Sequence, residues 1–195
     1  AQVVDQVDEI LFVLRHRVLR IDSVVPTVIP DEASEFRLAI RQAGEIRLQV
    51  RKRFADSKVK CVGLGSACEY HHQDHGIVQQ NIELTKQFVL LSRDIGATGV
   101  KVRPNALVKG EEKARTVERI ATALRECGRF AAEHNQEIRV EVHGNGTSAP
   151  SVIREIMVAT DHPAVRVCWN SNPGETVGGS LRQAFDQLRP FFGQT

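Results

Sequence analysis

Long apolar runs are missing from this sequence, and none approaches the roughly 18 residues that a membrane-spanning helix needs. No signal-peptide pattern opens the chain. The four cysteines, Cys61, Cys68, Cys127 and Cys168, form no CxxC pair. Three of them lie in or beside apolar segments, where a reduced cysteine packs as a small hydrophobic residue. These absences predict a reduced, cytoplasmic protein that does not enter the membrane.

A strong charge of either sign is also missing. Lysine and arginine total 26 residues against 24 aspartates and glutamates, which leaves a formal net charge of +2. This balance does not favour a broad nucleic-acid-binding surface. No GxGxxG or GxxxxGKS/T motif follows any predicted strand, so the usual sign of a nucleotide-binding open sheet is absent. With 42% hydrophobic and 26% charged residues, the chain has a globular composition, and we predict a single domain over residues 1–195.

Helical and strand patterns alternate along the chain. Helices are predicted where apolar residues recur three and four positions apart, at about 1–13, 31–55, 74–95, 111–134, 148–157 and 179–188. Strands are predicted at 18–21, 59–65, 99–103, 138–144 and 165–169. Asp74 and Ser148 are predicted N-caps, and Gly96 is predicted to close its helix. This alternation predicts a parallel sheet covered by helices.

Two architectures share that pattern, an open doubly wound sheet and a (β/α)₈ barrel. Polar residues follow each strand, and a barrel gathers such strand ends around one cavity, so we predict the barrel. A barrel typically needs about 250 residues. The 195 residues are therefore expected to form part of one, with about five or six βα units. An incomplete barrel would leave open edges and an uncovered apolar interior, which predicts either association into a homo-oligomer or poor solubility.

The segment 138–144 carries the clearest candidate for chemistry. Glu141 and His143 are two positions apart, so on a strand their side chains point to the same face. A carboxylate and an imidazole are costly to bury without partners, and they suit a metal ion or a sugar hydroxyl. The alternative is an edge strand whose two polar residues are simply solvated.

Three other strand ends carry comparable polar groups. Lys101 and Arg103 alternate on one strand and point the same way, so either could contact substrate or hold the strand-end acids in place. Glu69 is a candidate for proton transfer, or it forms a structural ion pair with Lys101 or Arg103. The remaining strand-end candidates for substrate contact are Asn105, His71 and Asn172, with His72 beside His71. The amide oxygen of Asn170 is either a weak metal ligand or a hydrogen-bond partner for its loop.

Four blocks, at 62–71, 99–105, 139–144 and 167–173, together resemble the xylose isomerase-like sugar phosphate isomerase/epimerase family. The resemblance runs from about Ala33 to the end of the sequence. It implies a TIM barrel with one divalent metal ion, Mn²⁺, Mg²⁺ or Zn²⁺. The family's ligands are a glutamate, an aspartate, a histidine and a second glutamate on successive strands. Glu141 matches the first, and Asn170 stands where the aspartate is usual. Because the Asn170 amide carries no negative charge, the resemblance implies weaker metal binding than in the family. Pro173 stands where the family often has a histidine.

The resemblance implies a metal-dependent isomerase or epimerase acting on a sugar, sugar phosphate or polyol by proton transfer beside a carbonyl. Glu141 is expected to be a metal ligand and catalytic, with Glu69 as the second catalytic carboxylate. Lys101, Arg103, Asn105, His143, His71 and Asn172 are expected to bind substrate. The alternatives are a degenerate, non-catalytic barrel or subunit, an inosose dehydratase-type lyase, and an apurinic endonuclease-like nuclease.

Overall fold

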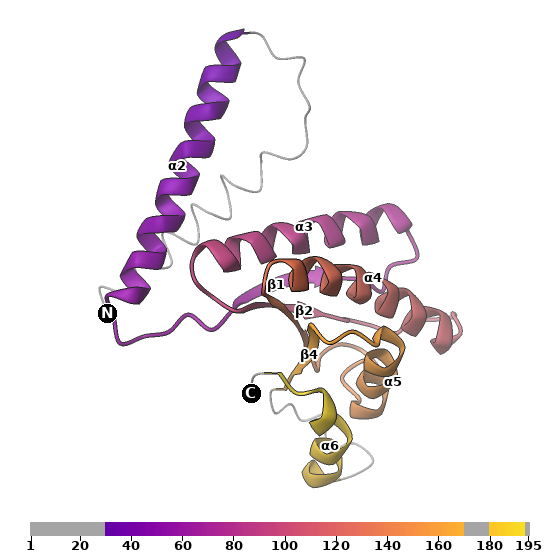
Figure 1. Ribbon diagram of the computed structural model, residues 1–195. Helices are drawn as coiled ribbons and strands as arrows, with labels where there is room; N and C mark the ends of the chain where they lie inside the picture. Colours follow the sequence, from indigo (N-terminus) through magenta and orange to yellow (C-terminus); the bar gives the residue numbers. More distant parts are fainter. Residues whose placement is uncertain (1–29, 170–179, 194–195) are drawn as a thin grey trace. The chain divides into compact units, whose positions relative to one another are not determined.

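The computed structural model describes residues 30–169 and 180–193, with side chains from residue 43 onward. The chain divides into two compact units, Ala1–Asp56 and Ser57–Thr195. In the first unit, helix α2 spans Pro30–Ala55 and confirms the helix predicted for this segment (Figure 1). The helix predicted at 1–13 and the strand predicted at 18–21 lie outside the described residues. The expectation of a single domain stays a prediction.

The second unit is built on a parallel sheet. Its described strands are β1 (Leu64–Glu69), β2 (Gly99–Arg103), β3 (Glu137–Glu141) and β4 (Val165–Cys168). Neighbouring strands are parallel, and their order in the sheet is β1-β2-β3-β4. Successive strands are therefore always neighbours, as in a βα barrel, whereas the order of a doubly wound sheet reverses at a switch point. The order confirms the predicted choice of a barrel-type sheet.

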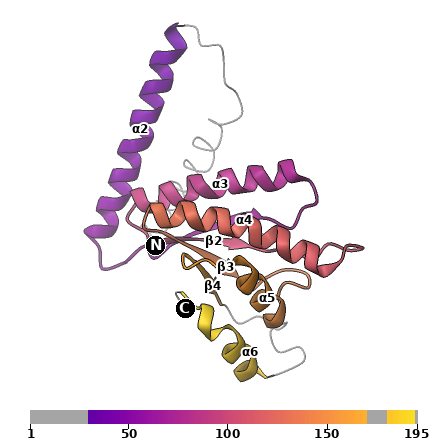
Figure 2. The same ribbon diagram turned by 45° about the vertical axis from the view of Figure 1, so that its right-hand side comes forward.

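Helices α3 (His75–Asp94), α4 (Lys113–Glu133) and α5 (Pro150–Thr160) connect these strands and pack on one face of the sheet (Figures 1 and 2). Helix α6 (Leu181–Leu188) packs against α5 and leads into the short 3₁₀ helix η3 (Arg189–Phe191). After η3, Phe192 forms a parallel bridge to Val167, so the chain returns to the open side of β4. This is where the next parallel strand of a barrel lies.

The helix ends follow their local sequence, with one exception. Asp74 caps α3, since its side chain accepts a hydrogen bond from the backbone N–H of Gly76. Gly96, with φ of +84°, directly follows Ile95, the C-cap of that helix, and closes the helix as predicted. Ser180 caps α6 in a capping box with Gln183. The prediction of Ser148 as the α5 cap is wrong, because Ala149 takes that position and Pro150 begins the helix.

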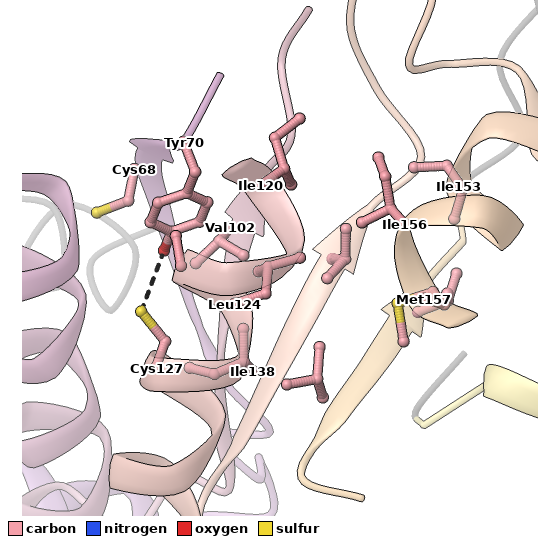
Figure 3. Close-up of a cluster of buried hydrophobic side chains, with 14 of the residues drawn as sticks. Cys68, Tyr70, Val102, Ile120, Leu124, Cys127, Ile138, Ile153, Ile156 and Met157 are labelled. Carbon is pink, nitrogen blue, oxygen red and sulfur yellow. Dashed lines mark hydrogen bonds between the residues drawn. The ribbon is translucent and has the colours of Figure 1, made fainter. Parts of the chain in front are cut away.

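The hydrophobic core lies between the sheet and its helices (Figure 3). Alternate strand residues point into it, among them Val102 and Ile138, and the facing helices supply Leu124 and Ile156. The phenol of Tyr70 is completely buried, and its hydroxyl lies 2.6 Å from Thr85 Oγ1. The larger fully buried side chains also include Ile120, Val89, Val100, Val140, Val142, Ile153 and Leu188.

Burial also determines the chemistry of the cysteines in the core. It raises the pKa of the Cys127 thiol to about 12 and raises the pKa of Cys68. We expect both thiols to resist a thiol-specific reagent at mildly alkaline pH, where they stay protonated and inaccessible. Cys61 and Cys168 are only half-buried and should react first. Counting modified thiols by mass spectrometry before and after denaturation checks this, and rapid modification of Cys127 in the native protein would contradict it.

The face of the sheet opposite the helices is polar, whereas an apolar interior was predicted. The strand residues that alternate with the core positions are charged or small: Gly65, Ala67, Glu69, Lys101, Arg103, Glu137, Arg139, Glu141, Arg166 and Cys168. The predicted uncovered apolar interior is therefore wrong for the described strands, because their second face is polar. An exposed apolar face therefore no longer supports self-association, which stays a prediction.

Candidate active site

Three charged side chains meet near the carboxyl ends of β2 and β3. The Nζ atom of Lys101 donates to Glu141 Oε2 over 2.6 Å, and Arg103 Nε donates to the same oxygen over 3.3 Å. Glu141 is only 6% exposed. A carboxylate this deeply buried requires compensating charge, and two cations provide it. We refer to Lys101, Arg103 and Glu141 as the charge triad.

The alternation of β2 and β3 builds this triad. Val100, Val102 and Val140 point to the helices, so the residues between and after them point to the other face. The register pairs Lys101 with Arg139, which places Glu141 two residues further along β3. The prediction that Lys101 and Arg103 point the same way is thus confirmed.

The proposed pairing of these cations with Glu69 is wrong. Glu69 ends β1, and its Oε2 atom lies 3.7 Å from His71 Nδ1 and 3.5 Å from His72 Nε2. The register between β1 and β2 shifts between Gly65 and Glu69, and such a bulge redirects the side chain that follows it. Glu69, His71 and His72 therefore form a separate group, which we call the β1-end cluster.

His71 is the most enclosed member of the β1-end cluster. Its side chain is 15% exposed, and its Nδ1 atom is buried without a hydrogen-bond partner. Burial is the main cause that lowers the pKa of this imidazole, with further lowering by His72 and Arg119 against an opposing effect of Glu69. A neutral imidazole is the form that binds metal ions.

The loops that follow β2 and β3 are bound to each other. Asn145 N–H donates to the carbonyl of Asn105 over 2.9 Å, and Leu107 N–H donates to the carbonyl of Asn145 over 2.9 Å. Asn105 has a φ of +70° and Gly144 a φ of +104°. This pairing holds the carboxyl-end loops of two strands in a defined position beside the charge triad.

The remaining predicted site residues have different outcomes. His143 follows the end of β3 and is half-buried, and its carbonyl accepts a hydrogen bond from Thr147. The alternation argument therefore does not reach His143, because the strand ends at Glu141. Asn170 and Asn172 lie outside the described residues, as does Pro173. Their expected roles, and the roles of Asn105 and His143 toward substrate, stay predictions.

Arg139 is an important residue that the sequence analysis did not single out. It is 7% exposed and lies in the row of Lys101 and Arg166 across the sheet. Its guanidinium donates to the Val62 carbonyl over 2.6 Å and to Thr98 Oγ1 over 2.8 Å, and it pairs with Glu137 at 3.2 Å. The sequence could have indicated this residue, because Arg139 lies two positions before Glu141 and therefore points to the same face of the strand.

Two places on the described strands offer side chains that could bind a divalent ion, the end of β1 and Glu141 on β3. In the described ranges, the β1-end cluster is the group in which three metal-ligand side chains lie within 4.8 Å of one another. The family resemblance implied Glu141 and Asn170 as metal ligands, and only Glu141 is among the described residues. The Oε2 atom of Glu141 already accepts hydrogen bonds from two cations, Lys101 and Arg103. The described part of the chain therefore fits a cation better at the end of β1 than at Glu141.

The parallel strands follow one another in the sheet in chain order, and polar groups lie at their carboxyl ends. This arrangement is that of βα-barrel proteins, whose active sites lie at the carboxyl ends of the strands. The family model of the xylose isomerase-like TIM barrel matches residues 25–172, so the chain belongs to that family. Among curated proteins, none matches the sequence significantly. In the described parts of the chain, no helix is long and apolar enough to cross a membrane.

Solved structures show the same fold at low sequence identity. The probable 3-DHS dehydratase AsbF from Bacillus anthracis is 15% identical with a TM-score of 0.64, over 80% of this chain and 56% of that one. The IOLI protein with a binding zinc atom is 15% identical with a TM-score of 0.63, over 72% and 51%. D-psicose 3-epimerase is 12% identical with a TM-score of 0.65, over 77% and 56%. The chain thus spans about half the length of these proteins.

Proposed function

We propose that the protein transfers a proton at a carbon next to a carbonyl, as a metal-dependent isomerase or epimerase of a sugar, sugar phosphate or polyol. The charge triad is the observation that carries this proposal. It places a carboxylate and two cations together near the carboxyl ends of adjacent strands, which is where barrel enzymes keep their sites. Several proteins of similar fold are sugar epimerases, including an L-ribulose 3-epimerase and a 3-keto-D-glucoside 4-epimerase from E. coli.

The members of the triad have complementary roles in this chemistry. Removing a proton beside a carbonyl develops negative charge on the carbonyl oxygen, and a nearby ammonium group stabilises that charge. Lys101 and Arg103 are 29% and 36% exposed, so both can reach a substrate oxygen while they hold Glu141. Glu141 acts as the base, and Arg103 keeps its carboxylate in position.

A second carboxyl group, that of Glu69, can donate a proton to the other face of the carbon when it is protonated. Glu141 keeps the proton that it removed, and both groups then exchange protons with water. Glu69 is paired in register with Arg103 across β1 and β2, so Arg103 lies between the strand of Glu69 and the carboxylate of Glu141. Epimerisation needs acid–base groups on both faces of the reacting carbon, and carboxylates from strands on either side of β2 suit that requirement. A divalent ion, where bound, would polarise the substrate carbonyl.

Deuterium exchange tests the proposal. The chain is incubated in D₂O with Mn²⁺, Mg²⁺ or Zn²⁺ and a panel of ketoses and ketose phosphates, and incorporation beside the carbonyl is followed by NMR. We expect exchange with at least one member of the panel, and a fall of about 100-fold or more in Glu141→Gln. Lys101→Met should lower the rate as well, because it removes the ammonium group that stabilises the negative charge developing on the substrate oxygen.

Arg166→Gln is the matched control. Arg166 lies on the same polar face, and no side-chain hydrogen bond or ion pair joins it to another described residue. The variant should keep the exchange rate within about twofold. Absence of exchange with every substrate, in a folded protein, would favour the non-catalytic barrel. Loss of water from a substrate, seen as a mass decrease, would instead favour the lyase, in line with the similar fold of the dehydratase AsbF.

A further inference from the structure

The β1-end cluster has a geometry that hydrogen bonds do not explain. The two nitrogen–oxygen distances, 3.7 Å from His71 Nδ1 and 3.5 Å from His72 Nε2 to Glu69 Oε2, are too long for good hydrogen bonds. His71 Nδ1 is nevertheless buried and lacks a partner. A buried ring nitrogen without a partner is costly, so the arrangement calls for a group that all three side chains can share.

A metal ion meets that requirement. Zinc binds imidazole nitrogen and carboxylate oxygen at about 2.0–2.2 Å, so two ligands of a tetrahedral site lie about 3.4 Å apart. The observed separations of 3.5 and 3.7 Å come close to that value. We propose that Glu69, His71 and His72 bind a divalent transition-metal ion, with Zn²⁺ favoured by the two imidazoles and one carboxylate. Three protein ligands leave a position for water or for a substrate oxygen.

The backbone around these ligands is held in place by two helices. Glu69 N–H donates to Asn81 Oδ1 of α3 over 3.1 Å, and Arg119 of α4 donates to the His71 carbonyl over 2.6 Å. Tyr70, between the ligands Glu69 and His71, is completely buried and hydrogen-bonded to Thr85. A site whose backbone is fixed before binding loses less entropy when the ion arrives.

The charges around the cluster permit a cation. Arg119 lies next to His71 and forms an ion pair with Glu111. Arg103, which is in register with Glu69, forms an ion pair with Glu141. The Glu69 and His72 side chains are 25% and 36% exposed, which leaves a route for the ion from solvent. Glu69 uses Oε2 toward both imidazoles, so its second oxygen remains for proton transfer. The site does not depend on the role proposed for Glu141.

Metal titration of the chelator-stripped chain tests this site. We expect Zn²⁺ to bind at one equivalent to the cluster, to raise the thermal unfolding midpoint, and to give an X-ray absorption spectrum with two imidazole ligands. His72→Gln should weaken Zn²⁺ binding by about 100-fold or more, and His71→Ala should do the same. His72 is the more exposed of the two, so His72→Gln keeps the test valid if His71→Ala does not fold.

Two controls separate this site from the one predicted at Glu141 and Asn170. His75→Ala changes an exposed histidine just outside the cluster and should leave Zn²⁺ affinity unchanged. Glu141→Gln should lower the rate of deuterium exchange by about 100-fold or more and still bind Zn²⁺ at the cluster. The proposal is overturned if the folded chain binds no Zn²⁺, or if the bound Zn²⁺ survives His72→Gln and is lost in Glu141→Gln.

Discussion

Gly144→Ala is expected to destabilise the protein by about 4 kcal/mol or more, enough to unfold many domains. Gly144 has a φ of +104°, where a side chain is strained. An added Cβ would also overlap the carbonyl oxygen of Asn105 and would lie 2.5 Å from Thr147 Oγ1. The first of these neighbours is backbone in the paired loops, so it cannot rotate away. Soluble yield and the urea unfolding midpoint measure the effect.

Gly110→Ala is the matched control, since it separates backbone strain from the steric overlap. Gly110 also has a positive φ, +83°, but a Cβ there would meet no atom within 4 Å. Gly110→Ala should therefore lower the free energy of unfolding by only about 1–2 kcal/mol, which is the cost of placing an alanine in the left-handed backbone conformation. Equal losses in the two variants would show that the overlap with the Asn105 carbonyl adds nothing to the backbone strain, and they would contradict the prediction for Gly144→Ala.

Arg139→Leu is expected to cost about 3 kcal/mol in the free energy of unfolding. The substitution leaves the Val62 carbonyl and the Thr98 hydroxyl with one partner fewer, and it leaves Glu137 without its cation. It also opens space above Gly63 and Gly99, because the guanidinium lies where side chains at these glycines would be. Chemical denaturation of the variant and the parent protein gives the difference directly.

Arg166→Leu makes the same chemical change in the same row of the sheet. Arg166 is paired in register with Arg139, and like charges that face each other across strands repel. It has no hydrogen bond or ion pair with another described side chain, so the loss should stay within about 0.5 kcal/mol. A loss as large as that of Arg139→Leu would mean that any arginine on this face is equally important, and it would refute the specific anchoring by Arg139.

The strand at residues 59–65 shows where periodicity alone misleads. The sequence predicted a strand ending at Gly65, but β1 spans Leu64–Glu69. The Val62 carbonyl instead accepts hydrogen bonds from the side chains of Thr98 and Arg139. The two donors come from elements far away in the sequence, so no local pattern could reveal that these residues are held by side chains rather than by a strand ladder.

The charge triad shows what local pattern can and cannot determine about a site. Alternation alone places Lys101 and Arg103 on one face of their strand, and the structure confirms it. Which carboxylate they bind depends on the register between strands, which sequence separation does not encode. The register pairs Lys101 with Arg139 and thereby delivers Glu141, while the bulge in β1 turns Glu69 toward the histidines.

By itself, the sequence determined the alternation of strands and helices, the barrel-type fold, and the strand ends as the place where polar side chains gather. Each of these follows from periodicity and residue type along a continuous segment. Only the tertiary structure decided the partners of Glu141 and Glu69, the role of Arg139 and the polar second face of the sheet. These depend on interstrand register and on side chains from distant elements, so they arise only when the strands are assembled side by side.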